Sequence, residues 1–138
     1  MSCVLRAGGP NFDVDSFLSN STLQPLIVYR RGQSRFPNSK AQPDEQSGMN
    51  ISLSVRDFSD LHGQIEDALR FLSANRSELQ RLIEFPGVES VEVDFPIHDR
   101  DVAVQSERFP TALISLLGEL RIGLVVSHYP ASSNSDVS

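Results

Sequence analysis

A short basic stretch, VYRRGQSRFPNSK, interrupts an otherwise acidic chain. It contains three arginines close to a glycine: Arg30, Arg31 and Arg35. Guanidinium groups bind carboxylates and phosphates through paired hydrogen bonds, so these side chains could form a site for an anion. The alternative is a strand end that runs into a solvated loop, with the arginines paired to acids such as Asp44 and Glu45. Because surface loops commonly carry charge, we favour this second interpretation.

A second polar cluster lies in the sequence FPIHDRDVAVQSERFP. His98, Asp99 and Asp101 are close together there, and Asp94 lies shortly before them. An imidazole with carboxylates could bind a divalent metal. These residues lack the regular spacing of recognised metal motifs, and the other histidines are distant in the sequence. We therefore predict a polar loop, with no metal and no cofactor.

His128 and Tyr129 close the last segment of the chain that has a strand pattern. His128 could act as a general base, with Ser127 or Ser106 as the nucleophile. The sequence has no G-x-S-x-G motif, and no acidic residue stands beside His128 to orient its ring. We predict a structural histidine, and we keep His128 and Tyr129 as candidate contacts for a ligand or partner. Cys3 lies in the first predicted strand, where we expect it to be a core residue rather than a nucleophile.

The strands that must position these side chains follow from apolar periodicity. The segments with a strand pattern are residues 3–6, 23–29, 49–57, 88–97, 124–129 and, less regularly, 102–106. The turn AGGPN closes the first strand, and we expect its two glycines to adopt positive φ. Residues 32–48 hold two prolines, two glycines and almost no apolar side chains, so we expect the longest and most mobile loop there.

Three segments have helical patterns. Asp13 is placed as the N-cap of a short first helix. A continuous apolar stripe predicts the longest helix over residues 60–84, with a kink or a break near Asn75. The last helix is expected to begin at Pro110 and to end at Gly123.

The predicted element order is β-α-β-β-α-β-(β)-α-β. Two of the strands show one polar face each, so we expect the helices to cover only one side of the sheet. This predicts an α+β domain: a two-layer sandwich with a mixed or antiparallel sheet, helices on one face, and a ferredoxin-like character. We expect a single domain over residues 1–130 and a flexible C-terminal tail over residues 131–138.

Composition narrows the class of protein. The chain has 138 residues and a formal net charge of −6, and its average field therefore repels nucleic acid. No apolar run approaches the roughly 20 residues that cross a bilayer, and the first residues lack the pattern of a secretory signal. A single cysteine rules out an intramolecular disulfide. We expect a cytoplasmic protein that binds neither nucleic acid nor membrane.

Four stretches carry a resemblance that spans most of the chain: LQPLIVYRRGQSRF, IEDALRFLSANRSELQRLI, PGVESVEVDF and RFPTALISLLGELRIGLVVSHY. With them the chain resembles a family of small bacterial single-domain proteins catalogued as a domain of unknown function. The resemblance carries over no catalytic or binding residue. Some small acidic bacterial proteins of this kind look like immunity proteins of toxin systems, which is an analogy at the level of class.

We predict a non-enzymatic protein-interaction module, of which an immunity protein is one concrete form. An acidic surface favours a basic protein partner, because complementary charge speeds association. Two alternatives stay open. One is a binder or enzyme for a small anionic ligand that uses Arg30, Arg31 and Arg35 together with His128. The other is a structural homodimer formed through the open sheet face or an edge strand.

Overall fold

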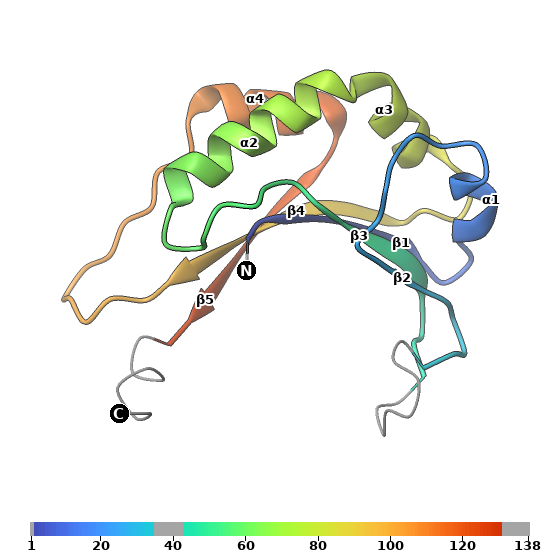
Figure 1. The fold of residues 1–138 in the computed structure, drawn as a ribbon, viewed down its shortest axis with the longest axis horizontal. Helices are drawn as coiled ribbons and strands as arrows, with labels where there is room; N and C mark the ends of the chain where they lie inside the picture. The colour runs from blue at the N-terminus through green and yellow to red at the C-terminus, as the bar shows by residue number, and fades with distance from the viewer. Residues whose placement is uncertain (1, 35–42, 131–138) are drawn as a thin grey trace.

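The computed structural model describes residues 2–34 and 43–130. Within these ranges the chain forms five strands and four helices, which Figure 1 traces from blue to red. In chain order they are β1 Val4–Gly9, α1 Val14–Leu18, β2 Ile27–Tyr29, β3 Ser47–Ser52, α2 Leu61–Ala74, α3 Arg76–Glu84, β4 Ser90–His98, α4 Thr111–Leu120 and β5 Gly123–Tyr129. The predicted tail over residues 131–138 and residues 35–42 of the predicted loop lie outside the described residues.

All five strands belong to one mixed sheet, in the order β2-β3-β1-β4-β5. β1 lies at the centre and pairs antiparallel with β3 and β4, while β5 runs parallel to β4. A parallel neighbour needs a crossover connection, which α4 supplies. Figure 1 shows α2, α3 and α4 along one side of the sheet, and no helix of the described residues covers the other side. The predicted α+β class is therefore confirmed, whereas the ferredoxin-like character stays a prediction.

The core lies between the sheet and the helices, and strand alternation builds it. On β1, Leu5 and Ala7 are buried on the face of the sheet that the helices cover, whereas Arg6 between them points to the other, uncovered face. On β4, Val93 and Phe95 are buried on the helix side, and Asp94 between them is buried as well, on the other face of the sheet. Among the helices of the described residues, none has the length and apolar character needed to cross a membrane.

The two glycines of AGGPN lie in a strand and not in a turn, which corrects the prediction. β1 extends to Gly9, and Gly8 pairs with Gly48 on β3. Glycine is required at position 9 because a Cβ atom there would lie 2.0 Å from the carbonyl oxygen of Gly87. Positive φ occurs instead at Gly32 and Gly87, with values of 81° and 88°. Close approach of two backbone segments, rather than a turn conformation, explains Gly9.

The helices follow the predicted periodicity with one correction. The helix expected over residues 60–84 is interrupted at Asn75, as predicted, so that α2 and α3 are separate helices. The last helix ends at Leu120 and not at Gly123, which is the first residue of β5. Arg121 ends this helix in the left-handed conformation, with φ of 60°. A non-glycine residue therefore occupies the position that glycine usually takes.

Three strand predictions need correction. β3 is Ser47–Ser52 rather than residues 49–57, and Val55, which was expected to share a face with Ile51 and Leu53, is 98% exposed. β2 comprises only Ile27–Tyr29 rather than residues 23–29. Pro25 cannot donate a ladder hydrogen bond, and backbone pairing with β3 begins only after it. Residues 102–106 form no strand, and Val104 in this segment is 79% exposed. The apolar residues of this segment therefore do not contribute to the core.

Aromatic rings close the end of the molecule where α1 and α3 meet. Phe12, Phe17 and Phe85 pack edge to face, with ring centroids 6.2, 5.8 and 5.2 Å apart. Phe12 and Phe17 are buried, and Phe85 is half-buried. Edge-to-face pairs of this kind add to the stabilisation that burial alone provides.

Arg81 of α3 covers this aromatic cluster. Its guanidinium carbon lies 4.1 Å from the centroid of the Phe17 ring. The same group donates hydrogen bonds to the carbonyl oxygens of Phe17 and Asn20, each at 3.1 Å. Arg81 also pairs with Glu78 at 2.9 Å and holds the pKa of that carboxyl below its usual value. One side chain thus joins two helices and shields a ring from water.

Candidate binding groove

α2 begins at a well-formed cap and runs over the sheet beside α4. The Asp60 side chain accepts a hydrogen bond from the backbone N–H of Gly63 at 2.9 Å, which fixes the first turn. Ile65 and Leu72 are buried on the face toward the core. The start of α4 is reached through residues 99–110, which form neither helix nor strand. This irregular segment, rather than another helix, lies beside the first turns of α2.

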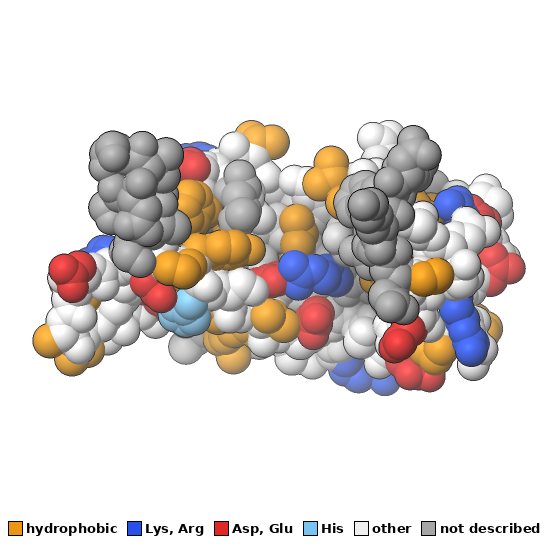
Figure 2. Space-filling view, turned by 90° about the horizontal axis from the view of Figure 1, so that it is seen from below, with side chains coloured by type: hydrophobic (Ala, Val, Ile, Leu, Met, Phe, Trp, Pro, Cys, Tyr) orange, Lys and Arg blue, Asp and Glu red, His pale blue; other side chains and the backbone are white. Residues whose placement is uncertain are grey.

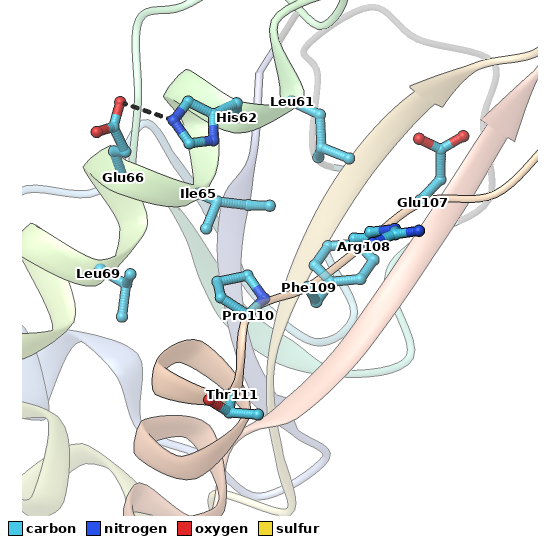
Figure 3. A pocket seen from close by; sticks show the side chains of 10 residues that line it. All are labelled: Leu61, His62, Ile65, Glu66, Leu69, Glu107, Arg108, Phe109, Pro110 and Thr111. Carbon is cyan, nitrogen blue, oxygen red and sulfur yellow. Dashed lines mark ion pairs between the residues drawn. The ribbon is translucent and has the colours of Figure 1, made fainter.

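A groove of about 920 Å³ lies between α2 and the segment that leads into α4. One wall is an apolar ridge formed by Leu61, Ile65 and Leu69, which recur every four residues and therefore share one helix face. Phe109 and Pro110 form the opposite wall. Figure 3 shows the ridge directed toward these two residues.

The apolar walls of the groove are only partly covered by the protein itself. Ile65 is buried, but Leu61, Leu69 and Phe109 are half-buried at the margin of the core. Pro110 is exposed. Apolar side chains that remain accessible in a concave surface mark binding sites more often than isolated exposed residues do. The groove is therefore the strongest candidate site in the described part of the chain.

Charged side chains lie along the rim of the groove. His62 and Glu66 lie one turn apart on α2, with His62 Nε2 3.8 Å from Glu66 Oε1 (dashed in Figure 3). Glu107 accepts a hydrogen bond from Gln105 Nε2 at 2.6 Å. Arg108 is exposed and forms no ion pair with any described residue. The rim therefore carries two carboxylates, one guanidinium and one imidazole.

A smaller hollow of about 330 Å³ adjoins the groove and shares Leu61 and Glu107 with it. Phe58 lies in its wall and packs against His98 and Tyr129, with ring centroids 5.2 and 6.3 Å apart. These ring contacts give Tyr129, a predicted contact residue, a packing role at the edge of the hollow.

Gln105 holds the irregular segment in place beside this hollow. Its Nε2 atom donates to the carbonyl oxygen of His98 at 3.1 Å, and its Oε1 atom accepts from the backbone N–H of Arg100 at 2.7 Å. The Nδ1 atom of His98 is buried and has no hydrogen-bond partner among the described residues. The side-chain hydrogen bonds of Gln105, rather than regular secondary structure, therefore hold residues 99–110 in place beside the hollow.

The predicted basic site is a strand end with engaged side chains. Arg30 forms a two-point ion pair with Asp15 on α1, at 2.8 and 2.7 Å, and holds the pKa of that carboxyl below its usual value. The backbone N–H of Arg31 donates to Ser47 Oγ at 2.9 Å, and its guanidinium donates to the carbonyl oxygen of Pro10 at 3.3 Å. The partner of Arg30 is an acid of the preceding helix and not of the following loop. The third arginine of the prediction, at position 35, lies outside the described residues.

The strand order separates the arginines from His128. Arg30 and Arg31 follow β2 at one edge of the sheet, whereas His128 belongs to β5 at the other edge. Neighbouring strands lie about 4.8 Å apart, so the two edges are separated by roughly 19 Å. One small ligand does not reach both. The predicted anion site that combines the arginines with His128 is therefore wrong.

His128 has an acidic partner that its sequence neighbourhood does not reveal. Its Nδ1 atom lies 2.8 Å from Asp99 Oδ1, in the segment that follows β4. Ser127 points to the opposite sheet face, where its hydroxyl donates to Asp94 at 2.8 and 2.9 Å. Adjacent residues of a strand face opposite sides, so His128 is not placed to activate Ser127. The histidine and the serine serve separate contacts.

The uncovered face of the sheet has a polar cluster at its centre. Figure 2 views this face and shows basic and acidic side chains among apolar ones. Asp94 is only 5% exposed there and pairs with Arg6 at 2.5 Å. Ser127 supplies the further hydrogen bonds to the same carboxylate. The cluster satisfies its own charges, which favours a structural role.

The structure also bears on the metal site considered around His98 and on the thiol of Cys3. Among the described residues, no three His, Cys, Asp or Glu side chains are grouped as a metal site requires. Asp94 and Asp99 are engaged with partners on different sides of β4, which divides the polar cluster around His98. Cys3 is buried, and this burial raises the pKa of its thiol to about 12, so the thiol stays protonated at neutral pH.

The groove itself was not predicted from the sequence. Leu61, Ile65 and Leu69 belong to the apolar stripe of the long helix, and the stripe alone does not tell which of its residues a neighbour covers. The sequence does contain one indication of the groove: residues 99–110, between β4 and α4, lack a helical pattern. Because this segment is not a helix, it covers only part of the apolar stripe of α2.

Comparison of the chain with protein-family models, with curated proteins and with solved structures gave no match. The resemblance to a bacterial family of unknown function therefore stays a prediction.

Proposed function

We propose that the chain is a protein-interaction module that binds an apolar segment of a protein partner in the groove between α2 and residues 107–111. The observation that carries this proposal is the half-covered ridge of Leu61, Ile65 and Leu69 facing Phe109 across an open groove. Burial of accessible apolar surface drives most protein association. The ridge offers such surface on a rigid helix, which costs little ordering on binding.

The dimensions of the groove suit a short helix. The positions of Leu61 and Leu69 differ by eight residues, which corresponds to about 12 Å along α2. An amphipathic helix presents an apolar face of this length over about two turns, through side chains at i, i+4 and i+7. The volume of about 920 Å³ accommodates several such side chains. The proposed occupant is therefore an amphipathic helical segment.

The charges favour a basic segment. Glu66 and Glu107 on the rim outnumber Arg108, and the chain carries a net charge of −6. Lysine or arginine beside the apolar residues of the partner would be attracted to this rim, and the attraction would mainly raise the association rate. A basic toxin bound by an immunity protein is one concrete form of such a partner.

The proposal can be tested with a defined probe. A synthetic amphipathic peptide of roughly 14 residues carries leucines on one face and lysines on the other, and a second peptide carries glutamates in place of the lysines. Fluorescence anisotropy with a labelled peptide measures the dissociation constant. We expect the basic peptide to bind the protein at least about tenfold more tightly than the acidic one, and the preference to fall with added salt.

Variants then locate the binding surface. The double variant Leu61→Gln/Leu69→Gln removes apolar surface from the ridge and should weaken basic-peptide binding at least about tenfold. Leu26→Gln is the matched control, since Leu26 is 66% exposed and lies by a different hollow on the uncovered face. Equal affinities for the double variant and the wild type would contradict the proposal.

A further inference from the structure

The two edges of the sheet differ in their protection against pairing with another strand. β2 has three residues and is followed directly by Arg30 and Arg31. β5 has seven residues, GLVVSHY, and contains no proline, lysine, arginine, aspartate or glutamate. Edge strands of natural proteins are usually short, charged or interrupted by proline, which prevents association. β5 has none of these protections.

The backbone of β5 presents unpaired groups along its outer edge. The carbonyl oxygen of Tyr129 accepts from the N–H of Asp99 at 3.0 Å, so Tyr129 faces β4. Backbone direction alternates along a strand, and therefore the N–H and C=O groups of Leu124, Val126 and His128 point away from β4. No described residue pairs with these groups.

Apolar side chains lie beside these unpaired groups. Leu124 and Val126 are in register with Val93 and Phe95 of β4, which are fully buried under the helices. Leu124 is nevertheless 37% exposed and Val126 is half-buried, because the sheet ends beside them. A further strand at this edge would cover both side chains.

We propose that β5 pairs with β5 of a second copy of the chain, antiparallel and about a two-fold axis at Val126. In this register Val126 lies opposite Val126 of the other copy, and Leu124 lies opposite His128. Each such pair exchanges two backbone hydrogen bonds. If the register were shifted by two residues, Leu124 or His128 of each strand would lie opposite a residue outside β5 and lose its strand partner. The two sheets become one continuous sheet, and a two-fold axis closes the assembly as a dimer.

Charge also favours a second copy in this orientation. Arg121, which pairs with Glu84 of its own chain at 3.5 Å, precedes β5, and Asp99 bonds His128 near the other end of the strand. Antiparallel pairing brings the Arg121 end of one copy to the Asp99 end of the other, where opposite charges attract. This surface is separate from the groove, so the inference does not depend on the proposed function.

Sedimentation equilibrium of the full chain between about 10 µM and about 1 mM tests the proposal, since an interface well below 1,200 Å² associates weakly. We expect a reversible monomer–dimer equilibrium. Val126→Lys and Val126→Glu each place like charges opposite one another and should raise the dissociation constant at least about tenfold. An equal mixture of the two variants should dimerise again. Val126→Thr adds no charge and should dimerise like the wild type.

Oxidative cross-linking tests the register and does not require the charged variants to fold. Cα atoms of a hydrogen-bonded antiparallel pair lie about 5.5 Å apart, within the range that a disulfide spans. Val126→Cys should therefore form a disulfide-linked dimer, whereas Ser77→Cys on the exposed side of α3 should not. Cys3 is fully buried and should not interfere. A monomer at all concentrations, a dimer unaffected by the charged variants, or failure of Val126→Cys to cross-link would overturn the proposal.

Discussion

At one end of the helical layer, where α1 meets α3, Phe17 and Phe85 pack together and Arg81 lies over the Phe17 ring. At the other end, where α2 begins, Leu61 and Leu69 are only half-buried beside a segment without regular structure. Figure 1 shows these two ends on opposite sides of the molecule. The same sheet supports both, so the difference comes from what each end packs against. The first end completes its own core, and the second leaves apolar surface for another molecule.

The comparison predicts that the same substitution has different costs at the two ends. Phe17→Ala should lower the free energy of unfolding by about 3–5 kcal/mol, because the ring is fully buried and leaves a cavity. Phe109→Ala at the groove should cost less, because that ring is only partly buried, where it packs against the Phe95 ring with centroids 5.3 Å apart. Urea denaturation of both variants measures the two values. Equal losses would show that the two ends are equally well packed.

A second prediction concerns the arginine that covers the aromatic cluster. Arg81→Leu should lower the free energy of unfolding by about 1–3 kcal/mol, because it removes two bonds to carbonyl oxygens, the contact with Phe17 and the pair with Glu78. Arg70→Leu on α2 is the matched control. Arg70 also pairs with an acid three residues away, Asp67, but its side chain is 73% exposed, so we expect a loss of less than about 1 kcal/mol.

The difference between wild type and Arg81→Leu should also depend on pH. Arg81 lowers the pKa of Glu78 in the folded state below its usual 4.5. A carboxyl whose folded pKa is lowered stabilises the fold above its unfolded pKa, and this contribution is lost as pH falls through the folded pKa. The stability difference should therefore be larger at about pH 7 than at about pH 3. A difference that grows on acidification would contradict the assigned pair.

The smallest effect on stability is expected in the groove. Leu61→Ala should cost about 1–2 kcal/mol, because the side chain is only partly buried in the folded state. Leu79→Ala on α3, at a fully buried leucine, is the matched control and should cost about 2–5 kcal/mol. Thermal or urea unfolding distinguishes the two. A large loss for Leu61→Ala would mean that the ridge belongs to the core and not to a binding surface.

These two regions also differ in how far the sequence predicts them. Asp13 as a helix cap and the break near Asn75 follow from local rules, and the structure confirms both. The pairing of His128 with Asp99 and the need for glycine at position 9 arise from contacts between distant segments. Local patterns do not encode such contacts.

The candidate site was harder to predict than the fold for the same reason. The periodicity of α2 predicts an apolar face but not the segment that packs against it. Residues 102–106 were a possible further strand in the sequence, yet that segment forms no strand and its valines are exposed. The separation of the arginines from His128 depends on strand order, which a single sequence does not fix.

Chemical-shift mapping by NMR with the basic amphipathic peptide shows which surface of the protein the peptide contacts. We expect the largest shift changes to cluster on residues 61–69 and 107–111, to saturate with peptide, and to be smaller in the Leu61→Gln/Leu69→Gln variant. Changes centred on the uncovered sheet face, around Arg6 and Asp94, would place binding elsewhere. Such a pattern, or no saturable change at all, would contradict the groove as the binding site.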